Sequence, residues 1–186
     1  MKRWLFILLV GILAACANQP PLNVEYKDAL DKSHTPAEYL ESNDGLVLLF
    51  LSPECPLCQN YAVAMRELRK AYSEKNIRFL GVISGDYYAK EEVHDYQVQY
   101  DLEMEMLFDP DFKLAHYYGA TATPEAVLTD KNGKLLYRGA IDNWAISLGR
   151  KRLEASAHYL RDAMDNFLSG NKIDPKETKP VGCFIE

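Results

Sequence analysis

The chain has 186 residues, of which 48% are hydrophobic and 26% are charged. That apolar fraction can build a buried core in one or two domains, and it excludes a disordered tail or a low-complexity fibre. The net charge of −6, without a cluster of lysine and arginine, argues strongly against a nucleic-acid-binding protein. The four cysteines, at positions 16, 55, 58 and 183, are too few for a disulfide-stapled scaffold and suit a chemical role.

The N-terminus predicts an export signal. Lys2 and Arg3 precede an apolar run over residues 4–13, which at about 1.5 Å per residue is too short to cross a hydrocarbon core of about 30 Å. Small residues then lead to Cys16, as at a signal cleavage site. We therefore expect a signal peptide over residues 1–15.

The sequence Leu-Ala-Ala-Cys at residues 13–16 also resembles the bacterial lipobox. This resemblance implies that Cys16 is lipidated and begins a tether over residues 16–24, whereas ordinary cleavage would leave Cys16 a free thiol. Ala17 resembles the outer-membrane sorting signal of enteric bacteria. The implied location is extracytoplasmic: a lipid-anchored protein on the outer membrane, facing the periplasm, where a cysteine pair can form a disulfide.

The rest of the chain alternates strand and helix patterns. Residues 46–51 form a continuous apolar run, typical of a strand buried on both faces. Asn132-Gly133 indicates a hairpin turn, and an apolar stripe along residues 147–169 predicts the last helix. We expect strands at residues 46–51, 77–83, 126–129 and 134–138, and helices at residues 36–43, 56–73, 89–101, 109–118 and 147–169.

This order predicts one α/β domain over residues 25–170, with helices on both faces of a central sheet. A tail with several prolines follows over residues 171–186 and carries Cys183.

The strongest chemical signal is Cys55-Pro56-Leu57-Cys58, between a predicted buried strand and a predicted helix. Pro56 suits the first helical position, which places Cys55 near the N-cap, where backbone donors and the helix dipole stabilise a thiolate. Cys58 lies one turn further on and can close a disulfide with Cys55. We expect Cys55 to be the nucleophile and Cys58 the more buried, resolving cysteine.

Two structural alternatives exist for this pair. A Cys-x-x-Cys sequence can be half of a zinc site, but structural zinc needs four ligands, and no second such pair or paired histidine motif follows. The pair could also be an inert disulfide.

Together with Thr123-Pro124 before a strand hairpin, the dithiol resembles the thioredoxin fold, and more closely its extracytoplasmic redoxin branch of thiol–disulfide oxidoreductases and peroxiredoxin-like proteins. The resemblance covers roughly residues 40–170. It implies a thioredoxin-like central mixed sheet, with an insertion near residues 85–105. It also implies a cis peptide bond before Pro124, beside the dithiol, with the backbone of Thr123 free to pair with a substrate strand.

The sequence departs from the thioredoxin pattern beside the dithiol. Glu54 replaces the usual tryptophan, and Leu49 stands where a buried carboxylate is common, so Glu54 is a possible auxiliary residue. A peroxidase of the peroxiredoxin type is an alternative function. Ser52 fits its pattern and Leu48 does not, and Arg138 would have to serve as the peroxide-polarising arginine.

The expected reaction is thiol–disulfide exchange with protein disulfides or dithiols, and it needs no cofactor. Extracytoplasmic chemistry of this kind requires an electron donor or acceptor in the membrane, which the sequence does not identify. The sequence also leaves the direction open, because the residues between the cysteines do not set the reduction potential.

Two further possibilities concern metal binding and the odd cysteine. A copper-binding thioredoxin-fold chaperone would use Cys55 and Cys58, with His116 as the best-placed histidine. Cys183 is either a third redox cysteine, a thiol for a partner protein, or a small buried residue in a tail that Phe184 and Ile185 hold down.

Overall fold

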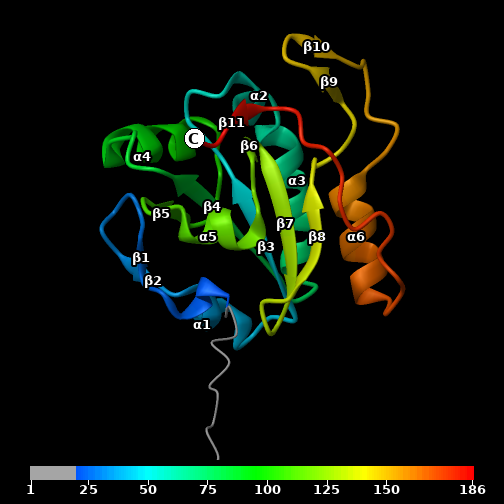
Figure 1. Ribbon diagram of the computed structural model, residues 1–186, viewed down its shortest axis with the longest axis horizontal. Coiled ribbons are helices and arrows are strands. Elements are labelled where there is room, and N and C mark those ends of the chain that lie inside the picture. The colour runs from blue at the N-terminus through cyan, green and yellow to red at the C-terminus, as the bar shows by residue number, and fades with distance from the viewer. Residues whose placement is uncertain (1–19) are drawn as a thin grey trace, which may run out of the picture.

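The computed structural model describes residues 20–186, so the predicted signal peptide, Lys2, Arg3 and Cys16 lie outside the described residues. A five-stranded sheet forms the centre, in the order β5-β4-β3-β7-β8 (Figure 1). Its strands are β3 (Gly45–Phe50), β4 (Ile77–Ser84), β5 (Met106–Asp109), β7 (Glu125–Asp130) and β8 (Leu135–Gly139).

The sheet is mixed, as the resemblance implied. β3 pairs in parallel with β4, which pairs in parallel with β5, whereas β7 runs antiparallel to both β3 and β8. The parallel strands are linked by helices and the last two by a tight hairpin, in keeping with the connection each pairing requires.

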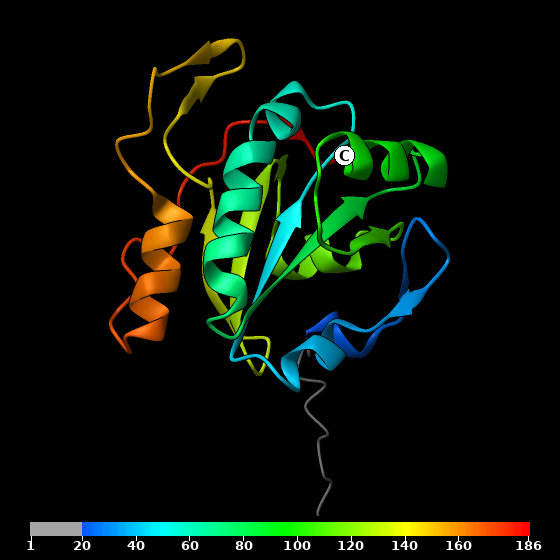
Figure 2. The same ribbon diagram turned by 180° about the vertical axis from the view of Figure 1, so that it is seen from behind.

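Helices cover both faces of this sheet, as Figures 1 and 2 show from opposite sides. Val47, Leu49 and Leu51 face one core, which includes residues of α3 (Ala62–Ser73), α4 (Lys90–Gln99) and α6 (Tyr159–Leu168). The alternate residues Leu46, Leu48 and Phe50 face a second core beside α5 (Lys113–Tyr118). All six side chains are at most 1% exposed, which explains why the sequence shows a continuous apolar run instead of alternation.

The remaining elements are short. They are η1 (Pro21–Asn23), β1 (Tyr26–Lys27), β2 (Ser33–His34), α1 (Pro36–Leu40), α2 (Pro56–Asn60), β6 (Ala122–Thr123), β9 (Ala145–Ser147), β10 (Arg150–Lys151) and β11 (Cys183–Phe184). None of the helices between residues 20 and 186 combines the length and apolar character needed to span a bilayer.

The insertion expected near residues 85–105 consists of α4 and β5 and extends to Asp109. β5 adds an edge strand to the sheet, parallel to β4. Val93 and Tyr96 of α4 are buried in the core shared with α3.

The helices expected over residues 36–43, 89–101 and 109–118 are present with ends shifted by up to four residues, as Pro36–Leu40, Lys90–Gln99 and Lys113–Tyr118, whereas two predicted helices differ more. The helix expected over residues 56–73 is interrupted at Tyr61, which separates α2 from α3, although the hydrogen bonds from Tyr61 to Leu57 and from Met65 to Tyr61 continue the helical ladder. The helix expected over residues 147–169 is wrong in its first half. It begins only at Tyr159.

In place of that first half, β9 and β10 form an antiparallel hairpin with Gly149 at its turn. Gly149 has a φ of +76°, a conformation that favours glycine. Leu153, which the apolar stripe placed on the buried face, is 97% exposed. The apolar stripe forms a buried helix face only from Leu160 onward, where Leu160 and Met164 are fully buried.

The two ends of the described chain are packed against the domain. Leu22 in η1 is 5% exposed and contacts the second core, so the packed chain begins before the boundary expected at residue 25. At the other end, Ile173 is 7% exposed. The tail then runs beside β8: the backbone N–H of Arg138 donates to the carbonyl oxygen of Lys176, and the N–H of Thr178 donates to the carbonyl oxygen of Arg138, both at 3.0 Å. In Figure 1, η1 and α1 lie at one end of the sheet, and β11 with α2 lies at the other.

Candidate active site

The dithiol lies where the chain leaves the carboxyl end of β3 and enters α2. Cys55 occupies the N-cap of α2, with φ −74° and ψ 115°, and Pro56 takes the first helical position, as the sequence predicted. A proline is tolerated there because its missing N–H would have no helical partner. This turn brings both sulfur atoms to the sheet edge at which α/β proteins commonly build their sites.

The loop before β7 lies against Cys55. The Thr123-Pro124 peptide bond is cis, as the resemblance implied. In its neutral form the Cys55 thiol donates a hydrogen bond to the carbonyl oxygen of Thr123, at 3.1 Å between the sulfur and the oxygen. Thr123 and Pro124 are both buried, so this loop forms one wall of the site.

The C-terminal tail lies directly beside this loop and brings a third cysteine to the site. β11 pairs antiparallel with β6, with Cys183 opposite Thr123 and Phe184 opposite Ala122. The Cys183 thiol donates a hydrogen bond to the sulfur of Cys55, with 2.8 Å between the two sulfur atoms. The three cysteines are free thiols in the structure.

Hydrogen bonds from the other two cysteines favour the ionised form of Cys55. The Cys58 thiol makes the largest contribution, and burial opposes it; the Cys183 thiol adds to the lowering, so that the pKa of Cys55 falls to about 4. The carbonyl of Thr123 favours the neutral thiol instead, but it is a single acceptor against two sulfur donors. Cys55 is therefore a thiolate at neutral pH.

The two donors are correspondingly difficult to ionise. Burial raises the pKa of Cys58 well above its ordinary value, and its hydrogen bond to Cys55 raises it further. Burial and the contact with Cys55 likewise raise the pKa of Cys183, to about 11. The three sulfur atoms thus share one negative charge, which resides on Cys55.

The exposure of the sulfur-bearing residues differs from the sequence prediction. Cys58 is fully buried, as expected for a resolving cysteine, but Cys55 is also buried and only 1% exposed. Cys183, in contrast, is partly exposed. The tail covers the nucleophile, which the sequence pattern alone did not indicate.

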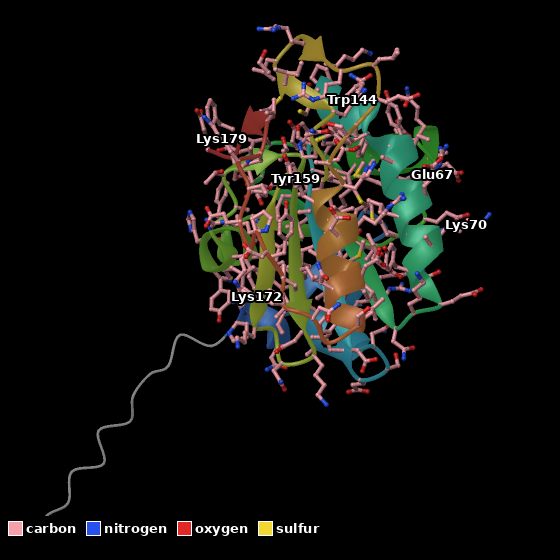
Figure 3. All side chains as sticks on the ribbon, turned by 90° about the vertical axis from the view of Figure 1, so that its right-hand side faces the viewer. Glu67, Lys70, Trp144, Tyr159, Lys172 and Lys179 are labelled. Atoms are coloured by element: carbon pink, nitrogen blue, oxygen red, sulfur yellow. The ribbon has the colours of Figure 1, made fainter. Side chains whose placement is uncertain are left out.

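Cys183 lies on the wall of an apolar groove of about 540 Å³ beside the dithiol. The groove lies between α2 and the β9–β10 hairpin, and Figure 3 shows Trp144 at the base of that hairpin. Its lining includes Pro56, Leu57, Trp144, Leu148, Lys151 and Cys183.

A set of side chains not identified from the sequence fixes the base of the hairpin. Tyr61 donates a hydrogen bond of 2.6 Å to Asp142 and meets the Trp144 ring edge-on, with 5.3 Å between the ring centroids. The interruption of the helix at Tyr61 therefore coincides with its contact with the hairpin.

Glu125 is a second residue that sequence reasoning missed. Its side chain is buried, and the carboxylate accepts backbone hydrogen bonds from Thr121 at 2.7 Å and Ala122 at 3.1 Å. These bonds hold the loop that presents Thr123 to both Cys55 and the tail. The signal available in the sequence was an acidic residue directly after the predicted cis-proline, in an otherwise apolar strand.

Several residues considered from the sequence are not brought to the sulfur atoms. Glu54 is exposed, and Ser52 shares a hydrogen bond of 2.7 Å with the Tyr88 hydroxyl. Arg138 donates hydrogen bonds to the carbonyl oxygens of Tyr118 and Gly119 and forms an ion pair with Glu177. Arg138 therefore joins α5 to the tail in this structure.

The histidine considered for copper also has another environment. His116 is exposed on α5 and stacks on Phe112, with 5.6 Å between the ring centroids. Over residues 20–186, no group of three or more histidine, cysteine or acidic side chains has the arrangement of a metal site.

The fold and the cysteine cluster define a protein of the thioredoxin-like class with a reactive dithiol. Residues 18–138, well over half of the chain, match the model of the AhpC/TSA family, so the chain belongs to that family.

Among characterised relatives, the chain is 27% identical over 92 residues to the thiol-disulfide oxidoreductase ResA of Bacillus thuringiensis subsp. konkukian. The match covers 50% of this chain and 52% of the relative, so the chain spans about half the length of the relative that it matches.

Two solved structures extend the comparison. A hypothetical protein from Sinorhizobium meliloti 1021 has a TM-score of 0.77 and 25% identity, covering 90% of this chain and 92% of its own. A secreted Mycobacterium tuberculosis disulfide oxidoreductase, described as homologous to Escherichia coli DsbE, has a TM-score of 0.55 and 16% identity. It covers 81% of this chain and 97% of its own, and it supports the fold alone.

Proposed function

We propose that this protein is an extracytoplasmic thiol–disulfide oxidoreductase that acts on protein disulfides or dithiols through Cys55 and Cys58. The observation that carries the proposal is the pairing of an ionised Cys55 with a protonated, fully buried Cys58, beside the cis-Pro124 loop. A low-pKa thiolate next to a resolving thiol is the arrangement that disulfide exchange requires. The likeness to a ResA thiol-disulfide oxidoreductase supports the same chemistry.

In the reducing direction, the Cys55 thiolate attacks one sulfur of a substrate disulfide. A bond forms between Cys55 and that sulfur, and the second substrate sulfur leaves with the electron pair and takes up a proton. Cys58 then loses its proton and attacks Cys55, which releases the first substrate sulfur as a thiol. The substrate gains two electrons, and the enzyme holds a Cys55–Cys58 disulfide.

The same steps in reverse oxidise a substrate dithiol. The side chains around Cys55 favour the reduced enzyme, because each hydrogen bond to the thiolate stabilises the dithiol state relative to the disulfide. Such stabilisation raises the reduction potential, which makes the protein more oxidising. The net direction depends on the membrane electron donor or acceptor that completes the cycle.

The test is disulfide reduction in insulin, with dithiothreitol as the electron source. Cys55→Ser should lower the rate at least a hundredfold, to the level of dithiothreitol alone. Glu54→Gln, a matched substitution at the exposed neighbouring position, should retain the rate within twofold. Undiminished activity in Cys55→Ser would remove the proposal.

We also propose that Cys16 anchors the protein by a lipid to a membrane on the extracytoplasmic side. The support is the lipobox-like sequence at residues 13–16. In cells fed radiolabelled palmitate, the wild-type protein should incorporate label and fractionate with membranes, and Cys16→Ser should do neither. Label in Cys16→Ser would contradict the anchor and leave the redox proposal intact.

A further inference from the structure

We propose that Cys183 is a third redox-active cysteine, which forms a disulfide with Cys55 by exchange with the Cys55–Cys58 disulfide. In this view, residues 180–186 lie in the active site as an internal substrate strand. The inference rests on the proposed function, because it requires a Cys55–Cys58 disulfide that forms and reopens.

The first argument is the position of the tail. β11 pairs with β6 directly before the cis-proline, with Cys183 opposite Thr123. Thr123 is also the residue whose carbonyl oxygen contacts the sulfur of Cys55. An extended chain paired at Thr123 therefore places its own cysteine next to Cys55, which is what a bound substrate must do.

The second argument is that the tail is held in this place along its length. The backbone N–H of Thr178 donates to the carbonyl oxygen of Arg138, and that of Ile185 donates to the carbonyl oxygen of Thr121. The Tyr87 hydroxyl donates to the backbone oxygen of Glu186 at 2.7 Å. Figures 1 and 2 show the tail crossing from α6 to the end of the sheet where α2 begins.

Gly182 permits this close approach. A Cβ atom added at Gly182 would lie 2.1 Å from the carbonyl oxygen of Thr123, far inside van der Waals contact. The residue before Cys183 thus must be glycine for the strand to lie this close to the cis-proline loop. The same observation supplies a substitution that should displace the tail.

The third argument is the difference in exposure between the two sulfur-bearing residues. Cys55 is 1% exposed, whereas Cys183 is partly exposed and lies on the wall of the apolar groove beside α2. With the tail in place, a thiol of another molecule reaches Cys183 more readily than Cys55. A Cys55–Cys183 disulfide would therefore carry oxidation from the buried pair to the surface.

The exchange balances without an external oxidant. Cys183 loses a proton and its sulfur attacks the sulfur of Cys55. The Cys55–Cys58 bond breaks as the Cys55–Cys183 bond forms, and Cys58 leaves with the electron pair and takes up a proton. A partner thiolate can then attack the sulfur of Cys183, forming a mixed disulfide there and releasing Cys55 as a thiolate. Cys55 is a good leaving group because a low-pKa thiol leaves faster.

The test uses the full-length Cys58→Ser variant, oxidised with oxidised glutathione and digested with trypsin without reduction. Trypsin should release Cys55 within residues 33–66 and Cys183 within residues 177–186, because the Lys179-Pro180 bond resists cleavage. We expect mass spectrometry to find at least nine in ten chains with these two peptides linked. Persistent glutathione on Cys55, with Cys183 open to alkylation, would overturn the proposal.

Two tail variants in the Cys58→Ser background test the strand pairing. Gly182→Val should reduce the linked peptide at least tenfold, because its side chain collides with Thr123. Phe184→Ala should leave the yield unchanged, because the Phe184 side chain is 80% exposed. Equal yields from both variants would contradict the internal-strand arrangement. A Gly182→Val chain with Cys58 intact should still form the Cys55–Cys58 disulfide, which checks its folding.

The exchange itself is tested in the wild-type chain. After oxidation by one equivalent of oxidised glutathione, alkylation followed by mapping should find both Cys58 and Cys183 partly modified, which indicates two disulfides in equilibrium. Modification of Cys183 alone would show that the tail does not exchange with the pair. A failure of this kind, in a protein that still reduces insulin, would remove this inference and leave the proposed function standing.

Discussion

Cys58 and Cys183 contact the same sulfur atom from two very different regions of the molecule. Cys58 follows Cys55 by one helical turn and lies in a fully buried core, so local backbone geometry fixes their contact. Cys183 lies 128 residues away in sequence, on a short strand at the surface. Both donate hydrogen bonds to Cys55, but Cys58 is a core residue, whereas Cys183 is only partly buried at the edge of that core.

This difference suggests that the contacts of Cys58 and Cys183 with Cys55 have different roles. In the proposed exchange, the buried contact would make Cys58 the resolving cysteine for a disulfide that forms at Cys55. The surface contact is conditional, because a substrate strand would have to take the place of β11 at Thr123 in order to pair there. The tail would therefore regulate access to the nucleophile as well as share its chemistry.

The largest expected effect comes from removing both cysteines that contact Cys55. With oxidised glutathione, Cys58→Ser/Cys183→Ser should accumulate a mixed disulfide at Cys55 at least tenfold above the level in Cys58→Ser alone, because no third thiol remains to displace glutathione. Intact-protein mass spectrometry reads the adduct directly. Equal adduct levels in the two proteins would mean that Cys183 does not resolve disulfides at Cys55.

A second effect concerns access to the nucleophile. Gly182→Val should increase the rate at which iodoacetamide alkylates Cys55 about tenfold at pH 8, because the tail no longer covers a residue that is only 1% exposed. Peptide mapping after timed quenching measures this rate, and Phe184→Ala serves as the control. An unchanged rate would show that the tail does not limit access.

The third effect is on acidity. The pKa of Cys55 is lowered to about 4, so its thiolate persists at neutral pH and is lost only as the pH falls through that value. Cys183→Ala removes one donor, and a hydrogen bond to a charged group is worth roughly 1.5–3 kcal/mol, so the pKa should rise by about 1–2 units.

Thiolate absorbance at 240 nm, followed against pH, measures this midpoint. The Cys55→Ser variant supplies the baseline, because it lacks the titrating group. A midpoint that stays in place in Cys183→Ala would limit the stabilisation of the thiolate to Cys58.

The smallest effect is on the loop that presents Thr123 to the tail. Glu125→Gln removes a buried charge that accepts two backbone hydrogen bonds, and the free energy of unfolding should fall by about 1–3 kcal/mol. Urea denaturation measures the change. In the Cys58→Ser background the same substitution should also lower the yield of the Cys55–Cys183 link, whereas the Cys55–Cys58 disulfide of the otherwise wild-type chain should form normally.

The sequence predicted the parts of the site that local rules govern. The apolar run ending before the dithiol indicated a buried strand, and Pro56 after Cys55 indicated the N-cap, because both signals depend only on neighbouring residues. The cis peptide bond before Pro124 came from the family resemblance and is confirmed. The insertion near residues 85–105 was anticipated in the same way, although β5 carries it to Asp109.

The parts that the sequence did not predict depend on tertiary contacts. The apolar stripe at residues 153–167 looks the same whether or not its first turns have a neighbour to pack against, and Leu153 has none. Likewise, the residues around Cys183 are compatible with a third redox cysteine, a thiol for a partner protein or a small buried residue, and only the path of the chain places its sulfur 2.8 Å from that of Cys55.

The polypeptide enters the domain through η1, at the end of the sheet opposite the dithiol (Figure 1). A domain tethered through this entrance would turn its thiols outward, away from the surface that holds it. In that orientation a bulky protein client could approach the cysteines without meeting the lipid headgroups, so anchoring and catalysis would not compete for space.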